Sequence, residues 1–227
     1  MAHYVITVAQ QKGGAGKTTV AAHLAIAFSQ MGKKVAAIDV DPQGSLTAWH
    51  TIREKRFGEG FTGVNFTALS GWKLGAEIDR LKSDYDIIVI DSPPHTETEA
   101  KTAIRSADLV VIPMQPSPTD LWATKSTIEL TRKDGIEAYI LLNRMPPSGK
   151  LAAAIAKDLP HRLKTELHNR VAYQSCLLEG RAVTETAPSG DAAKEIRALV
   201  QEVVKLMEKS SGEKPETKST KSKSKAG

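Results

Sequence analysis

The sequence predicts an α/β fold in which a mostly parallel, doubly wound sheet is covered by helices on both faces. Segments rich in Val and Ile alternate with helix-like segments, and the apolar run at residues 87–90 lacks the alternation of a half-exposed strand. Strands that are joined through helices need right-handed crossover connections, and these build a parallel sheet. In such a sheet, ligands bind beyond the carboxyl ends of the strands.

The alternation is carried by well-separated segments. Strands are expected at residues 4–9, 34–39, 85–91, 109–113 and 138–143, with a short edge strand at 64–68. Helices are expected at residues 17–31, 74–82, 120–132 and 191–208. The last helix has an apolar stripe that is typical of a face packed on a core, formed by Ala192, Ile196, Leu199, Val200, Val203 and Met207.

The composition indicates one globular domain followed by a polar tail. Of the 227 residues, 41% are hydrophobic and 25% are charged, as in an ordinary single domain. We expect residues 1–208 to form this domain and residues 209–227 to be disordered, because the tail has no large apolar residue. Its six lysines and two glutamates give +4 of the formal charge of +5. A solvated tail and a weak electrostatic tether to DNA both stay open.

Several classes of protein are excluded by what the sequence lacks. No apolar run reaches the roughly 18 residues that a membrane span needs, and the N-terminus leads into a strand without a signal peptide, so a cytoplasmic location is expected. Cys176 is the only cysteine in the sequence. An internal disulfide and a cysteine-ligated metal centre are therefore excluded.

A phosphate-binding loop is the strongest functional signal. The first strand leads into a helix through Lys12-Gly13-Gly14-Ala15-Gly16-Lys17-Thr18-Thr19. Glycines let backbone N–H groups face phosphate oxygens, and the helix N-terminus adds its positive end. Lys17 is expected to neutralise the β and γ phosphates, and Thr18 to offer its hydroxyl to Mg²⁺. The sequence therefore predicts a site for ATP or ADP with Mg²⁺.

Acidic residues end two of the predicted strands. Asp39 and Asp41 lie two residues apart on an extended chain, so their side chains point the same way at the carboxyl edge of the sheet. Asp91 ends the apolar strand at residues 85–91, an arrangement that presents a carboxylate to Mg²⁺ through water. An alternative role for Asp41 is to cap a helix that begins near Ser45.

The phosphate loop departs from the general pattern in one respect. Gln11 stands where that pattern has glycine, and Lys12 precedes two glycines. This Lys-Gly-Gly-x-Gly-Lys-Thr form is the deviant Walker A motif, in which the chain resembles the ParA/MinD family of P-loop ATPases over residues 4–208. Because it is short and has no N-terminal DNA-reading domain, it is most similar to the ParA branch of compact, ParF-like plasmid-partition ATPases.

The resemblance implies roles for particular residues. It implies that Lys12 reaches the partner's phosphates across an ATP-bound homodimer. It also implies that Asp41 orients the attacking water and helps to hold Mg²⁺, while Asp39 supports the site. Asn143, with Arg144 beside it, is expected at the adenine base, where an amide both donates and accepts. Residues 116–121 resemble a segment at the dimer face, with an N-cap for Thr119 as the alternative.

The function that the resemblance implies is an ATP-dependent dimerisation switch with slow hydrolysis. The ATP dimer would bind nonspecific DNA of the nucleoid, and a ParB-like or adaptor partner would stimulate hydrolysis, which drives plasmid or chromosome partition. Basic residues late in the chain are candidates for DNA contacts, although such runs are usually solvated faces. These residues are Lys157, His161, Arg162, Lys164, Arg170, Arg181, Lys194 and Arg197.

Other functions of the same fold stay open. The same mechanism can position a protein cargo, such as a chemoreceptor cluster, on the nucleoid. A small-molecule ligase similar to dethiobiotin synthetase is an alternative of another class, although the segment at residues 39–43 favours the partition branch. MinD-like membrane binding is disfavoured because a polar tail follows the last helix. Metal- and electron-carrying relatives use paired cysteines, which this chain does not have.

Overall fold

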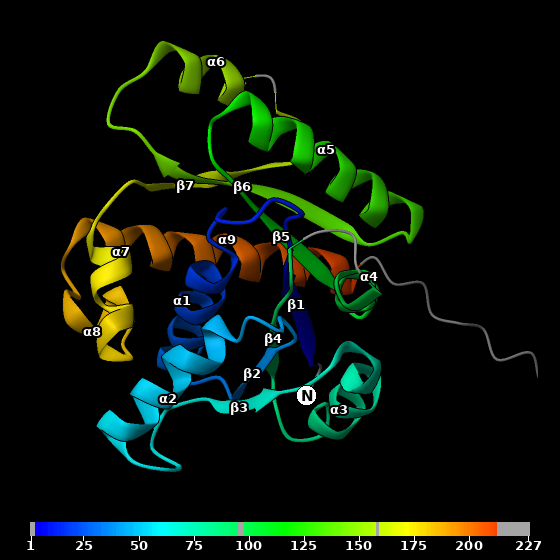
Figure 1. Cartoon of the computed structure of the whole chain (residues 1–227), viewed down its shortest axis with the longest axis vertical. Helices are drawn as coiled ribbons and strands as arrows, with labels where there is room; N and C mark the ends of the chain where they lie inside the picture. Colours follow the sequence, from blue (N-terminus) through cyan, green and yellow to red (C-terminus); the bar gives the residue numbers. More distant parts are fainter. Residues whose placement is uncertain (1–2, 95–97, 158, 213–227) are drawn as a thin grey trace, which may run out of the picture.

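The described strands of the computed structural model form one seven-stranded parallel sheet (Figure 1). The structure describes residues 3–94, 98–157 and 159–212. The strands are β1 (Tyr4–Val8), β2 (Val35–Asp39), β3 (Asn65–Ala68), β4 (Ile87–Asp91), β5 (Leu109–Met114), β6 (Glu137–Met145) and β7 (Arg162–His168). Their order in the sheet is β3-β2-β4-β1-β5-β6-β7, and each neighbouring pair is parallel. The fold class predicted from the sequence is therefore confirmed.

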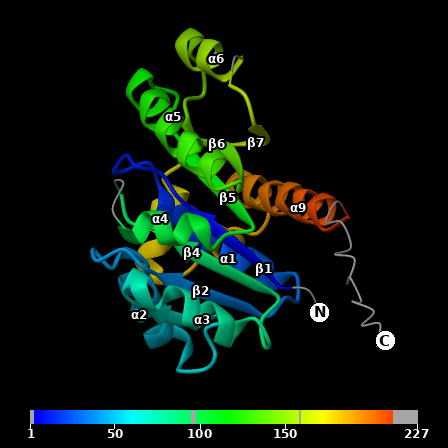
Figure 2. The same cartoon turned by 90° about the vertical axis from the view of Figure 1, so that its right-hand side faces the viewer.

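Helices cover both faces of this sheet (Figures 1 and 2). The helices are α1 (Lys17–Gln30), α2 (Ser45–Phe57), α3 (Leu74–Leu81), α4 (Thr98–Arg105), α5 (Pro118–Lys133), α6 (Lys150–Lys157), α7 (Ala172–Ser175), α8 (Val183–Thr186) and α9 (Asp191–Gly212), with 3₁₀ turns η1 (Gly71–Lys73) and η2 (Leu177–Glu179). Residues of α1, α2, α8 and α9 share one apolar cluster. Those of α3, α4, α5 and α6 pack into clusters on the opposite face.

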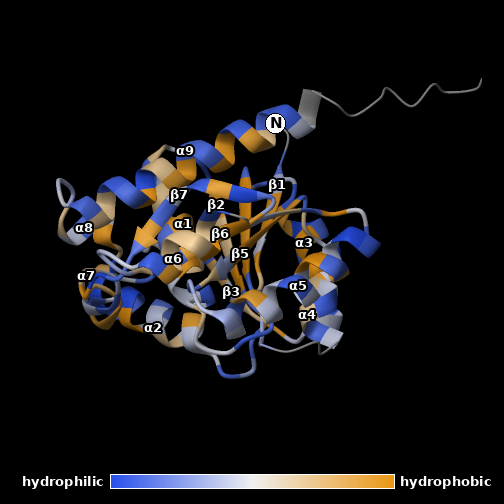
Figure 3. Cartoon of the chain, turned by 90° about the horizontal axis from the view of Figure 1, so that it is seen from above, coloured by the Kyte–Doolittle hydropathy of each residue, from blue (hydrophilic) through white to orange (hydrophobic). Residues whose placement is uncertain are grey.

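The central strand β1 shows why the strands carry no alternation. Val5 packs into the cluster that contains Ile78 of α3. The next residue, Ile6, packs instead into the cluster that contains Leu24 of α1 and Leu199 of α9. Both faces of β1 are buried, so apolar side chains are favoured at successive positions. The orange interior of Figure 3 follows these strands.

The strand order brings the predicted site residues to one edge. The sheet is parallel, so every strand ends at the same edge, and β1 lies between β4 and β5, where the direction of winding reverses. The loop that follows β1 therefore opens at the switch point, where ligands bind in folds of this kind. The loops after β2, β4, β6 and β7 reach the same edge.

Some elements differ from those expected. The strand β7 was not predicted, because its sequence alternates charged with apolar residues; only Leu163 and Leu167 are fully buried, in the cluster that contains α9. The helices α4, α6, α7 and α8 were not predicted either. The helix α9 runs to Gly212, beyond the expected domain end at residue 208. The rest of the predicted tail, residues 213–227, lies outside the described residues. None of the described helices has the length and hydropathy of a membrane span.

Candidate functional site

The loop between β1 and α1 adopts a backbone that only glycine accommodates at its end. Gly14 and Gly16 have φ values of 76° and 98°, in the region that side chains rarely occupy. A Cβ on Gly16 would also collide with the side-chain amide of Asn143, whereas a Cβ on Gly13 would meet nothing within 4 Å. The open side of the loop at Gly13 and Gly14 is thus free for a ligand, and its closed side at Gly16 rests on β6.

The start of α1 places a cation and a hydroxyl next to Asp91. Lys17 is largely buried, and this burial lowers the pKa of its ammonium group, while the charges of Asp91 and Asp41 act in the opposite direction. The hydroxyl of Thr18 donates a hydrogen bond of 2.6 Å to Oδ2 of Asp91. These three side chains are the ones that the sequence assigned to phosphate and Mg²⁺, and the structure brings them together.

The carboxylate of Asp91 is suited to a cation. It is fully buried, and burial raises its pKa to about 7, against a smaller opposite effect of the Thr18 hydrogen bond. Its second oxygen, Oδ1, has no hydrogen-bond partner among the described residues. A buried, unpaired carboxylate oxygen is costly unless a ligand satisfies it. Mg²⁺ prefers such oxygen ligands, so Asp91 and Thr18 fit this ion.

The two aspartates after β2 have different surroundings. Asp39 is buried, and its Oδ2 accepts hydrogen bonds from both the backbone N–H (2.8 Å) and the hydroxyl (2.7 Å) of Thr47 in the first turn of α2. The side chain that caps α2 is therefore Asp39, and the capping role considered for Asp41 is not observed. The side chain of Asp41 accepts one hydrogen bond, of 2.9 Å, from the N–H of Gln43, and Asp41 lines the cavity beside the phosphate loop.

This cavity has a volume of about 560 Å³ and is large enough for a nucleotide. One wall consists of the phosphate loop, from Gly13 to Thr19, with Asp41 beside it. The opposite wall is apolar and comes from α2 and η2, through Trp49, Ile52, Leu177 and Leu178. The phosphate loop thus gives this cavity a charged end that matches the phosphates of a nucleotide.

Asn143 supports the phosphate loop from behind. Its Nδ2 donates a hydrogen bond of 2.8 Å to the carbonyl oxygen of Ala15, and its Oδ1 accepts one of 2.9 Å from the N–H of Arg144. Arg144 has a φ of 53°, so this second bond stabilises a left-handed residue. Both polar groups of the Asn143 amide thus bind backbone atoms. Contact of Asn143 and Arg144 with the adenine base stays a prediction.

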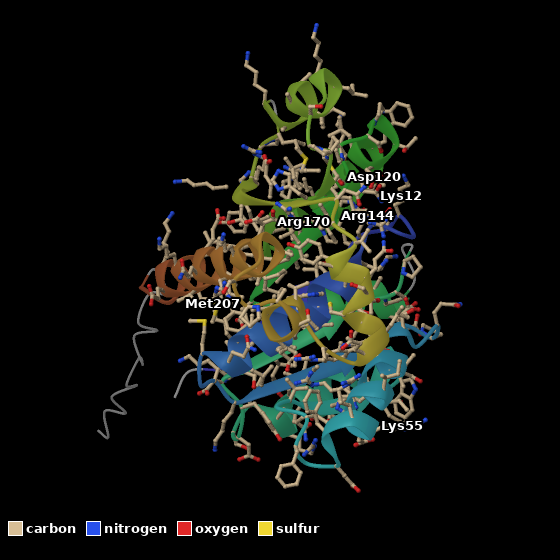
Figure 4. All side chains as sticks on the ribbon, turned by 90° about the vertical axis from the view of Figure 1, so that its left-hand side faces the viewer. Lys12, Lys55, Asp120, Arg144, Arg170 and Met207 are labelled. Atoms are coloured by element: carbon tan, nitrogen blue, oxygen red, sulfur yellow. The ribbon has the colours of Figure 1, made fainter. Side chains whose placement is uncertain are left out.

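Lys12 folds back onto its own subunit (Figure 4). Its Nζ forms an ion pair with the carboxylate of Asp120, in the first turn of α5, and donates a hydrogen bond of 3.1 Å to the hydroxyl of Thr119. Asp120 also accepts hydrogen bonds from the side chain of Ser117 (2.8 Å) and the N–H of Gln115 (3.1 Å). Ser117 is the N-cap of α5, so the alternative of an N-cap at Thr119 is wrong.

Comparison with known proteins places the chain in a family. Residues 6–211 match the model of the CobQ/CobB/MinD/ParA nucleotide binding domain. The chain belongs to this family. The match spans the phosphate loop, both acidic strand ends and Asn143, so the predicted ParA/MinD membership is confirmed.

Individual members of the CobQ/CobB/MinD/ParA family are similar along nearly their whole length. The maintenance of carboxysome distribution protein A of Halothiobacillus neapolitanus is 29% identical, over 88% of this chain and 96% of that protein. The chromosome-partitioning ATPase Soj of Thermus thermophilus is 26% identical, over 88% and 94%. The septum site-determining protein MinD of Pyrococcus horikoshii, solved with Mg-ADP, has a TM-score of 0.76 at 25% identity, over 92% and 98%.

The basic residues considered for DNA contacts differ in their surroundings. Four of them pair with acids: Arg162 with Glu166, Arg170 with Glu195, Arg181 with Glu179, and Lys194 with Asp191. Lys157, His161 and Lys164 are exposed and form no ion pair within residues 3–94, 98–157 and 159–212. One acid next to the site was not singled out as a site residue from the sequence, namely Asp120, which pairs with Lys12.

Proposed function

We propose that this protein is an Mg²⁺-dependent ATPase that dimerises around ATP and uses slow hydrolysis to time its release from DNA. The observation that carries the proposal is the position of Lys12. The lysine lies at the mouth of the phosphate loop and is 37% exposed, although its partner Asp120 is only 1% exposed. A cation held at the surface by a buried acid is available to a second subunit.

The nucleotide would be held by residues already in place. Lys17 and the backbone of the loop from Gly13 to Thr19 line the cavity and would face the phosphates. Thr18 and Asp91 would hold Mg²⁺, which neutralises charge on the phosphates during phosphoryl transfer. Asp41, which lines the same cavity, would orient the attacking water. Asp39 would support the site by fixing the first turn of α2 through Thr47.

Dimerisation would follow when Lys12 exchanges its ion pair with Asp120 for contact with the phosphates of the second subunit. In the subunit described here, Lys12 offsets the buried charge of Asp120. Two facing ATP molecules concentrate negative charge between the subunits, and a lysine from each side would reduce this repulsion. ADP lacks the γ phosphate and offers less charge. Association would therefore depend on ATP, and hydrolysis would reverse it.

The cargo would be either DNA or a protein body. Similarity to the chromosome-partitioning ATPase Soj supports the partition of DNA with a ParB-like partner on the nucleoid. Similarity to the maintenance of carboxysome distribution protein A supports a protein cargo that is positioned through an adaptor. Both mechanisms require an ATP dimer that binds DNA without sequence preference.

The proposal is tested by measuring ATPase rate, dimerisation and DNA binding together. We expect DNA binding to require ATP and Mg²⁺, and the logarithm of the binding constant to fall linearly with the logarithm of the salt concentration. The assay should be repeated on residues 1–212, because the lysine-rich tail binds anions by charge alone. Binding by the shortened chain that ignores ATP or salt would contradict the proposal.

A further inference from the structure

The carboxylate of Glu195, in the second turn of α9, collects hydrogen bonds from a single neighbouring segment. It accepts bonds from Nε (3.0 Å) and Nη2 (2.8 Å) of Arg170 and from the hydroxyl of Tyr173 (2.7 Å). It also contacts Nδ1 of His168 (3.0 Å) and accepts a bond from the backbone N–H of that residue (3.1 Å). One acid thus fixes the whole segment from the end of β7 to α7.

This segment, residues 168–174, forms one wall of a narrow slot next to the phosphate loop. The segment contributes His168, Asn169, Arg170, Tyr173 and Gln174, and the facing wall consists of Gly16, Thr19, Asn143 and Arg144. The slot shares the residues Gly16, Thr19 and Arg144 with the larger nucleotide cavity, so the two are continuous. The wall that residues 168–174 form depends on Glu195 for its position.

The chemistry of the slot suits a heterocyclic base. The side chains of Asn169 and Gln174 form no hydrogen bond with other described residues, and an amide can donate to and accept from the edge of a base. The free volume of about 20 Å³ accommodates a water molecule but not a purine. A base can therefore enter only if the segment moves away from Asn143.

We propose that Glu195 is the positioning residue of the nucleotide-base subsite and that it transmits the movement of residues 168–174 to α9. The inference rests on the proposed function only in that a nucleotide binds at the phosphate loop. Glu195 itself touches neither phosphate nor base. It acts through Arg170, Tyr173 and His168.

A second acidic residue of α9 also forms hydrogen bonds with this part of the chain. Glu202, two turns further along α9, accepts hydrogen bonds from the backbone N–H groups of Lys164 (2.7 Å) and Thr165 (2.9 Å) in β7. Glu202 thus joins β7 to α9, and Glu195 joins residues 168–174 to the same helix. Lys194, next to Glu195 on α9, is one of the candidate DNA contacts. A base in the slot would act on the same unit that carries this cation.

The electrostatics favour an ionised Glu195. Burial alone would raise the pKa of its carboxyl group, but the hydrogen bonds from Arg170, Tyr173 and His168 outweigh burial, so the pKa lies below its usual value. A glutamine at this position keeps the shape but removes the charge, and its NH₂ group cannot accept from these donors. The substitution Glu195→Gln therefore loosens the segment without creating a cavity.

The test compares two ligands that share phosphates but differ in the base. Calorimetric titration with Mg-ADP and with Mg-pyrophosphate is carried out on the full chain, on Glu195→Gln and on the control Glu202→Gln. We expect Glu195→Gln to weaken ADP binding about tenfold and to change pyrophosphate binding less than about twofold. The control should leave both affinities as they are. In hydrogen exchange, ADP should protect residues 191–200 in the unaltered chain and not in Glu195→Gln.

Other outcomes of these titrations would overturn either the inference or the proposed function. An equal loss for both ligands, or an equal selective loss in Glu202→Gln, would overturn the inference, since both indicate general loosening of α9. Unchanged ADP affinity in Glu195→Gln would overturn it as well, while the proposed function would stand. Failure of the unaltered chain to bind either ligand would refute the proposed function itself. Should Glu195→Gln not fold, Tyr173→Phe removes one of the donors and should show the same selectivity to a smaller extent.

Discussion

Replacing Asp120 by asparagine should strengthen ATP-dependent dimerisation. In the free subunit, the Asp120 carboxylate has three donors, from Lys12, Ser117 and Gln115. When Lys12 moves to the partner's phosphates, the carboxylate remains buried and loses the cation that offsets it. The amide oxygen of asparagine can still accept from the N–H of Gln115, and its NH₂ group can donate to the hydroxyl of Ser117, but it has no charge to leave uncompensated. The substitution therefore removes a cost that opposes the dimer.

The expected change in the free energy of dimerisation follows from the burial of Asp120 and the exposure of Lys12. A buried charge that loses one hydrogen-bonding partner costs about 1–3 kcal/mol. Because Lys12 is 37% exposed, solvent screens the pair, and the lower end of about 1 kcal/mol applies. A dimer releases two lysines, so Asp120→Asn should favour association by about 2 kcal/mol, or about 30-fold in the association constant.

Sedimentation velocity over a concentration series in Mg-ATP measures this shift. The measurement uses the Asp41→Ala background, in which ATP should persist because the water-orienting carboxylate is absent. Asp134→Asn is the matched control, since Asp134 follows the other end of α5 and pairs with Arg105, not with Lys12. An association constant that is unchanged or lower in Asp120→Asn, or that rises equally in the control, would refute the reasoning.

Three further predictions concern the phosphate loop and the stability of the fold. Lys17→Ala removes the buried cation at the phosphates and should abolish ATP binding. Calorimetry that finds normal affinity would contradict the assignment of this loop as the phosphate-binding site. Gly16→Ala places a Cβ against Asn143 at a φ of 98° and should lower ATP affinity more than Gly13→Ala, where there is open space; equal effects would count against the loop geometry. Burial lowers the pKa of His23 to about 4. The unfolded state then binds more protons below pH 6.5, so stability should fall by about 3 kcal/mol as the pH drops from 6.5 to 4. Chemical denaturation should find this loss absent in His23→Gln, and an equal slope in both proteins would disprove it.

The local chemistry of the phosphate loop could be predicted from the sequence. Lys17, Thr18 and Asp91 belong to motifs whose spacing fixes their place at the carboxyl edge of a parallel sheet. Contacts between distant segments could not be predicted. Lys12 and Asp120 lie 108 residues apart, and the ion pair depends on how α5 begins beside β5.

Two other features show the same limit. The amide of Asn143 was expected at the base from family position, but its contact with Ala15 depends on the approach of β6 to the loop. The strand β7 has the sequence pattern of a solvated segment, and only packing against α9 identifies Leu163 and Leu167 as core residues. Sequence periodicity thus fails at this edge strand, where one face is polar.

The most direct test of the central claim is the mass of the protein in different nucleotides. Sedimentation velocity should give the 24.5 kDa subunit with Mg-ADP and twice this mass with Mg²⁺ and a non-hydrolysable ATP analogue. Lys12→Gln should bind the analogue and remain a monomer, because Lys17 still holds the phosphates in its own subunit. The same mass in both nucleotides, or normal dimerisation of Lys12→Gln, would contradict the account.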